Sequence, residues 1–176
     1  MRWLRIVLGT VVLLGIIVIG IGFALPSDYR VERSVDVEAP PERIYPFVAA
    51  PRRWQQWSIW TRRDPAMTIV YFGPESGAGA GWRWDSKTEG RGEMTLVEAD
   101  PAHGLRYTLY FPDFDSTSTG SIVLAPTSAG TRVTWTNAGS TGRNPLKHYL
   151  AATMDRLVGP DFEAGLHNLK TLAEKQ

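Results

Sequence analysis

The carboxyl groups of Asp85 and Glu93 and the imidazole of His103 are the side chains best suited to act as a general acid and base. Catalysis by proton transfer needs such groups within hydrogen-bond reach of a substrate inside a pocket. Asp85 and Glu93 lie in segments where apolar and polar residues alternate, and both occupy polar positions opposite the Trp or Met rows. We therefore expect them at the surface, and the sequence predicts no catalytic residue.

Other motifs for cofactor or metal chemistry are incomplete. The glycine-rich segment 77–81 lacks the sixth glycine of a dinucleotide-binding loop, because Trp82 stands there, and no Lys-Ser/Thr pair follows. His148 and His167 lie on one helical segment but point about 100° apart around its axis, so they do not form a ligand pair. The chain has no cysteine and no Gly-x-Ser-x-Gly segment. Neither a metal nor a cofactor is predicted.

Tryptophan is unusually frequent in this chain. Six of the seven Trp residues follow residue 25: Trp54, Trp57, Trp60, Trp82, Trp84 and Trp135. Tryptophan combines a large apolar body with one N–H that needs an acceptor. A small domain with so many indoles either packs a bulky core or lines a cavity for an apolar molecule. The cluster at 54–60 allows both interpretations, a cap over the core or a cavity wall.

An uncharged run of twenty residues, 6–25, precedes the region that carries these side chains. As a helix it would be about 30 Å long, which matches the hydrocarbon thickness of a bilayer. The alternative is a secretory signal, since Arg2 and Arg5 precede the run and small residues occur near its end. Signal sequences have shorter apolar cores, and Pro26 makes a poor cleavage site, so we expect an uncleaved single-pass anchor.

Charge sets the expected orientation and excludes one class of partner. Arg2 and Arg5 favour a cytoplasmic N-terminus, with the domain on the periplasmic or extracytoplasmic side, although Arg33 and Arg43 weaken this preference. The rest of the chain carries 17 basic and 18 acidic residues. Because no basic stripe exists, nucleic-acid binding is not expected. We expect two segments, an anchor with a short linker at 1–27 and one monomeric domain at 28–176.

Periodicity and turn residues predict an α+β domain. Residues 29–37 alternate as a strand, Pro40-Pro41 begins a helix, and Pro51 begins a second short helix. About six strands follow between residues 67 and 138, separated by Gly-, Asp- and Pro-containing turns, as in an antiparallel meander. One long helical segment, 145–175, contains Pro160, which should kink it. Only this helix is long enough to cover the sheet.

Several segments resemble a known family. Residues 38–45 (EAPPERIY) and 54–60 (WQQWSIW) match it, as do residues 73–79, 130–135 and 159–163. Over about residues 28–174 the chain resembles the SRPBCC superfamily, in particular bacterial proteins of the polyketide cyclase/dehydrase type. The resemblance implies the START-like or helix-grip fold of the birch-pollen allergens, an antiparallel sheet wrapped around a long C-terminal helix. It does not imply a reaction, because members of the superfamily bind diverse ligands without a shared catalytic motif.

A gap between sheet and helix would be the natural ligand site. The residues expected to contact a ligand there are Trp57, Trp60, Trp84, Met94, Tyr107, Trp135, Met154 and Phe162. We expect the domain to bind a hydrophobic or amphipathic small molecule, lipid or isoprenoid-like, beside a membrane. Two alternatives stay open: an enzyme of the cyclase or dehydratase type acting on a polyketide-like substrate, and a closed-core protein-interaction domain.

Arg33 is the one charge in an otherwise apolar row, with Val31, Val35 and Val37. A charge in such a row is costly unless it has a partner. We expect a salt bridge at the end of the sheet; the alternative is an anionic head group inside the cavity.

Overall fold

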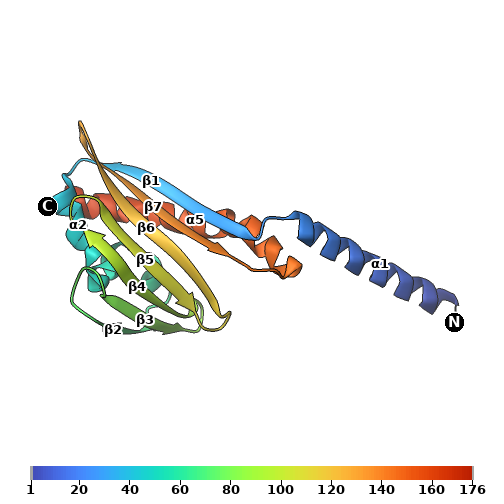
Figure 1. Ribbon diagram of the computed structural model, residues 1–176. Coiled ribbons are helices and arrows are strands. Elements are labelled where there is room, and N and C mark those ends of the chain that lie inside the picture. Colours follow the sequence, from blue (N-terminus) through green and yellow to red (C-terminus); the bar gives the residue numbers. More distant parts are fainter. Residues whose placement is uncertain (1, 176) are drawn as a thin grey trace.

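The computed structural model describes residues 2–175, so residues 1 and 176, the outer ends of the two predicted segments, lie outside the described part. Figure 1 shows an α+β domain with one helix, α1, projecting from it. The helical elements are α1 (Arg2–Ala24), α2 (Pro41–Ala49), the 3-10 turn η1 (Pro51–Arg53), α3 (Trp54–Trp57), α4 (Trp60–Arg63) and α5 (Pro145–Glu174). The strands are β1 (Asp28–Val37), β2 (Thr68–Phe72), β3 (Gly81–Ser86), β4 (Gly90–Asp100), β5 (Gly104–Phe111), β6 (Ser116–Thr127) and β7 (Gly130–Ser140).

The strands form one antiparallel sheet in the order β1-β7-β6-β5-β4-β3-β2. Strands β2 to β7 are joined as successive hairpins, and β1 closes the order by pairing with β7. Helices α2 to α4 lie in the crossover from β1 to β2, and α5 packs against β1 and β7 (Figure 1). The predicted helix-grip architecture is confirmed.

One local feature differs in detail from the sequence prediction. The segment from Pro51 folds as a 3-10 turn followed by two one-turn helices, α3 and α4, where one short helix was expected. Helix α5 continues through Pro160 as a single 30-residue element. Asn144 caps its first turn, because the side-chain Oδ1 accepts from the Leu146 N–H, and Pro145 fits the first helical position.

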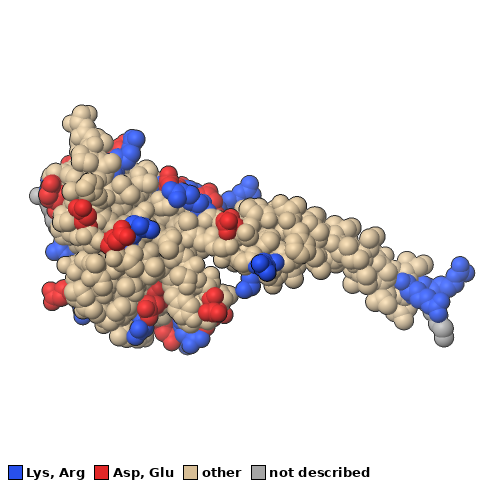
Figure 2. Space-filling model, in the orientation of Figure 1, with Lys and Arg blue, Asp and Glu red and all other residues tan. Residues whose placement is uncertain are grey.

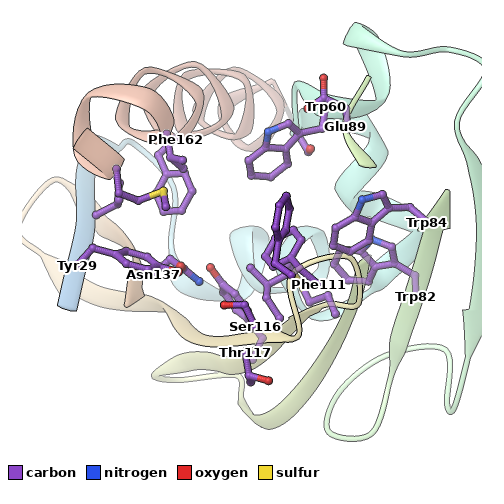
Figure 3. Close-up of a pocket in the computed structure, with 18 of the residues that line it drawn as sticks. Tyr29, Trp60, Trp82, Trp84, Glu89, Phe111, Ser116, Thr117, Asn137 and Phe162 are labelled. Carbon is purple, nitrogen blue, oxygen red and sulfur yellow. The ribbon is translucent and has the colours of Figure 1, made fainter. Parts of the chain in front are cut away.

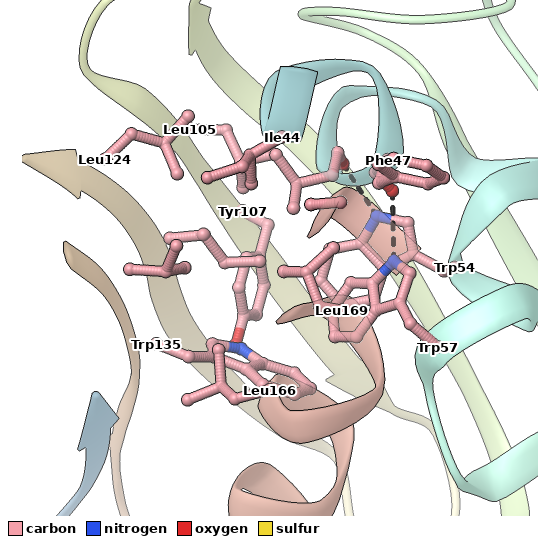
Figure 4. Packing of buried hydrophobic residues seen from close by; sticks show 14 of the residues in the cluster. Ile44, Phe47, Trp54, Trp57, Leu105, Tyr107, Leu124, Trp135, Leu166 and Leu169 are labelled. Carbon is pink, nitrogen blue, oxygen red and sulfur yellow. Dashed lines mark hydrogen bonds between the residues drawn. The ribbon is translucent and has the colours of Figure 1, made fainter. Parts of the chain in front are cut away.

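The closed core lies under the C-terminal half of α5. Leu166 and Leu169 of α5 belong there to one buried cluster with Ile44 and Phe47 of α2 and with the fully buried Trp57 (Figure 4). Among the described residues, no comparable cluster of buried side chains lies under the N-terminal half of α5, which lines a cavity instead. The helix therefore seals the domain with one half and spans an open interior with the other.

Helix α1 stands outside the domain. It is the one helix in residues 2–175 that is long and apolar enough to cross a membrane. All of its residues are exposed except Gly22, which is buried where the helix contacts the domain. A helix that is apolar on every side is poorly soluble in water, so this exposure fits a membrane or a cleaved signal sequence.

Candidate functional site

A cavity of about 770 Å³ lies between the concave face of the sheet, α3 and α4, and the N-terminal half of α5. In Figure 3, Phe162 faces the cavity from α5, while Trp82 and Trp84 face it from β3 on the opposite side. Tyr29 of β1 and Asn137 of β7 line the part below α5. The volume lies within the range of about 300–1,000 Å³ that is typical of small-molecule sites.

Seven of the eight residues expected from the sequence line this cavity. They are Trp60, Trp84, Met94, Tyr107, Trp135, Met154 and Phe162. They come from six elements, α4, β3, β4, β5, β7 and α5, so the fold brings together side chains that are distant in the sequence. Their contact with a ligand remains a prediction.

Trp57 takes a different position. Its side chain is fully buried in the closed core, and its Nε1 donates to the Phe47 carbonyl oxygen at 3.0 Å (Figure 4). The two indoles of α3, three residues apart, lie on the same side of the helix and contact each other with a centroid separation of 4.5 Å. Trp54, which was not among the expected ligand contacts, lines the cavity instead.

Hydrogen bonds fix the aromatic wall. Trp135 Nε1 donates to Tyr107 Oη at 2.9 Å, and Tyr107 Oη donates to the Thr136 carbonyl oxygen at 3.2 Å. The Trp135 ring stacks on Phe162 with a centroid separation of 3.9 Å and an interplanar angle of 7°. Burial raises the pKa of Tyr107 far above its usual value, so this hydroxyl stays a neutral donor. The wall is therefore preorganised and apolar toward the cavity.

A small polar group interrupts the apolar lining beside α4. Glu89 lines the cavity, is only 16% exposed at its side chain, and lies 3.5 Å from an Arg63 nitrogen. Arg63 also binds Asp161 at 2.6 Å, and Asp161 accepts from Trp60 Nε1 at 3.1 Å. Thr61 lines the cavity too, and its hydroxyl is buried without a hydrogen-bond partner among residues 2–175. These groups could orient one polar end of a bound molecule.

The acid–base candidates do not reach the cavity. Asp85 is exposed, Glu93 is engaged by Arg83 on the outer face of the sheet, and the His103 side chain is 82% exposed beside Asp100. The strand parity inferred from the sequence placed Asp85 and Glu93 correctly. Within residues 2–175 no three His, Cys, Asp or Glu side chains are grouped to hold a metal ion.

Arg33 forms the expected salt bridge. Its guanidinium contacts Asp155 at 2.7 Å and Glu163 at 2.6 Å, both on α5, and it lies against Gly159. The hydrogen bond from Arg33 lowers the pKa of Asp155 below its ordinary value. A side chain at Gly159 would collide with the guanidinium. Arg33 thus ties the middle of α5 to β1 and does not line the cavity.

Sequence reasoning did not single out Glu89 and Thr61 as site residues. Glu89 lies in the β3–β4 turn and Thr61 in a four-residue helix, and neither segment has a periodicity that reveals which way a side chain points. Leu146 and Leu150 also line the cavity. Leu146, Leu150 and Met154 are spaced four residues apart, which puts them on one face of α5, and this spacing is the signal that identifies them.

Comparison with known proteins agrees with this geometry. Residues 28–174 match the family model described as polyketide cyclase / dehydrase and lipid transport. No curated protein matches the chain. Among solved structures, protein MLL2253 from Mesorhizobium loti superposes with a TM-score of 0.61 at 18% identity, covering 84% of this chain and 98% of that chain. Protein SA2116 from Staphylococcus aureus, of unknown function, gives 0.62 at 13% identity, covering 84% and 94%.

At these identities the solved structures support the fold alone. The family match spans all seven strands and the whole of α5, and it leaves α1 outside. The seven-stranded sheet, the gripping helix and the family match lead to one conclusion. The chain belongs to the polyketide cyclase / dehydrase and lipid transport family of the SRPBCC superfamily.

Proposed function

We propose that this protein is a membrane-anchored binding domain for a hydrophobic or amphipathic small molecule, lipid or isoprenoid-like. The observation that carries the proposal is the preformed 770 Å³ cavity with its predominantly aromatic and aliphatic lining. Burying about 300 Å² of apolar ligand surface there would contribute about 7 kcal/mol before the costs of association are subtracted. An apolar ligand thus has a physical reason to leave water for this site.

Helix α1 supports the membrane part of the proposal. An apolar ligand is concentrated in a bilayer, and a tether keeps the cavity beside that source. Arg2 and Arg5 before the helix favour a cytoplasmic N-terminus, with the domain on the periplasmic or extracytoplasmic side. We expect a monomer.

The two alternatives have weaker support. An enzyme of the cyclase or dehydratase type needs an acid and a base facing one another in the cavity. Among residues 2–175, the charged side chains lining the cavity are Glu89, Asp115 and Lys147, and Glu89 is paired with Arg63, outside the lining. A closed-core interaction domain would lack the open interior. Binding is therefore the function that the geometry favours.

The proposal is tested by energy transfer from tryptophan to parinaric acid, a fluorescent fatty acid, with the full chain in lipid nanodiscs. Leu109 lines the cavity from β5, and Leu109→Trp should obstruct the cavity with a bulkier, uncharged side chain. The matched control is Val123→Trp on β6, where the side chain is 44% exposed and absent from the lining. We expect saturable transfer in the wild type and in the control, and loss of the saturable part in Leu109→Trp. Equal transfer in all three proteins would contradict the proposal.

A further inference from the structure

The end of α1 is bound to the start of α5 by specific contacts. Tyr149 Oη donates to the Val18 carbonyl oxygen at 2.8 Å, and His148 Nδ1 lies 2.8 Å from the Gly22 carbonyl oxygen. A Cβ atom at Gly22 would lie 2.5 Å from the Pro145 carbonyl oxygen, so the two helices touch through their backbones. The first two turns of α5 therefore have a fixed position along α1.

That position lies deep in the apolar run. Val18 precedes Leu25, the last residue of the run, by seven residues, or about 10 Å along a helix. A hydrocarbon layer about 30 Å thick needs all twenty residues of the run. If α1 spans the bilayer, the Val18 carbonyl lies inside the leaflet next to the domain. Tyr149 reaches that carbonyl, so the start of α5 must lie at or below the lipid head groups.

The surface of α5 fits such a location. Leu146 and Leu150 are one helical turn apart and are 56% and 46% exposed. Arg143 and Lys147 are exposed beside them, and Figure 2 shows basic side chains where α1 meets the domain. Leucines in contact with acyl chains and basic side chains that reach head groups are typical of an interfacial helix.

The same residues border the cavity. Leu146, Lys147 and Leu150 line it from α5, and Phe114, which is 69% exposed, lines it from the β5–β6 turn. The β5–β6 turn and the start of α5 lie at the end of the domain nearest α1 (Figure 1). These exposed lining residues of the cavity thus lie at the end of the domain nearest α1.

We propose that the cavity opens directly into the leaflet, through a mouth bordered by Leu146, Leu150 and Phe114. The first two turns of α5 are embedded in that leaflet, and an apolar ligand enters sideways from the acyl chains without crossing water. This inference rests on the proposed function, because it requires α1 to be inserted. It adds the surface that contacts the lipid and the route of entry.

The chain has no cysteine, so single cysteines can be introduced and labelled with the environment-sensitive fluorophore NBD. The full-length protein is reconstituted in nanodiscs of phosphatidylcholine and phosphatidylglycerol. Leu146→Cys and Leu150→Cys report on the mouth. Val97→Cys and Val123→Cys, which are 45% and 44% exposed elsewhere on the domain, are matched controls, and Val12→Cys in α1 reports insertion. Two quenchers are used: nitroxide-labelled phospholipid for lipid contact and dithionite for access from water.

At residues 146 and 150 we expect nitroxide quenching close to that at residue 12, with several-fold slower dithionite reduction than at residues 97 and 123. If residue 12 is quenched by lipid but residues 146 and 150 react with dithionite like the controls, the mouth proposal is overturned and the anchor stands. Protection of residues 146 and 150 from both quenchers also overturns it, because a protein would then cover them. If residue 12 is not quenched, both the anchor and the mouth proposal fail.

Discussion

Two tryptophans three residues apart, Trp57 at the end of α3 and Trp60 at the start of α4, lie in different surroundings. Trp57 lies in the closed core and donates to the Phe47 carbonyl, whereas Trp60 lines the cavity and donates to Asp161. We expect Trp57→Phe to lower the free energy of unfolding by about 1–3 kcal/mol, through the lost hydrogen bond and packing, with unchanged ligand affinity.

We expect Trp60→Phe to behave in the opposite way, with a smaller loss of stability and weaker parinaric acid binding. Urea unfolding in detergent micelles and the nanodisc titration measure the two quantities. A Trp57→Phe variant that binds more weakly at full stability would show that the two roles are assigned wrongly.

The Arg33–Asp155 contact predicts a dependence of stability on pH. Because the arginine lowers the pKa of Asp155 in the folded state, this contact stabilises the fold above the ordinary carboxyl value of 3.8. Its contribution is lost as the pH falls through the lowered pKa. The difference in urea midpoint between wild type and Asp155→Asn should therefore be largest near neutrality and shrink in acid.

Glu75→Gln is the control for that experiment, since Glu75 is an exposed carboxylate in the β2–β3 connection. It should leave the urea midpoint unchanged at either pH. A midpoint difference for Asp155→Asn that stays constant from neutral pH to pH 3 would show that the ion pair does not stabilise the fold.

Among the elements, α5 is the one that divides the domain into core and cavity. Its buried residues after Phe162 close the interior, and its leucines before Met154 stay half exposed at the mouth. We expect Leu150→Glu to fold normally, because the position is 46% exposed, and to slow uptake of a fluorescent lipid from vesicles by about tenfold. A carboxylate is costly among acyl chains, so it would draw the mouth away from lipid.

Val123→Glu is the matched variant, with similar exposure on β6. Its uptake rate should equal that of the wild type in the same stopped-flow assay. If both glutamate variants slow uptake equally, the mouth is not where the ligand enters.

The element order was predictable from the sequence for a physical reason. Alternating residues between turn signals define antiparallel strands locally, so β3 and β5 emerged with the correct inward faces, Trp82 and Trp84 on one and Tyr107 on the other. Whether α5 would fill the interior was not predictable. The size of the gap under α5 depends on the curvature of the sheet. It also depends on Arg33 of β1, which binds two carboxylates of α5 that are more than 120 residues away in the sequence.

The molecule as a whole consists of a domain with a cavity and the apolar helix α1, which contact each other at Gly22 and Pro145. Deletion of residues 3–26 should release the domain into the soluble fraction of cells, because α1 is the one described helix able to cross a bilayer. Fractionation followed by immunoblotting measures this. A deleted protein that remains entirely with membranes would show that α1 is not the sole tether.

The junction itself had no signature in the sequence. His148 and Tyr149 read as ordinary helix residues, and their carbonyl partners on α1 are more than 120 positions away. Contacts of this kind follow from how two helices meet, which no local pattern records. The apolar helix and the helix-grip domain were each predictable, but the position along α1 at which they join was not.

The central claim, that the cavity holds an apolar guest, is tested most directly by native mass spectrometry of the full chain taken from membranes in nanodiscs. We predict a wild-type mass with one additional small molecule that is extractable into organic solvent. The guest should be retained in Val123→Trp and missing from Leu109→Trp. If the wild-type protein is detected at the mass of the polypeptide alone, with no more bound molecule than Leu109→Trp, the binding proposal is contradicted.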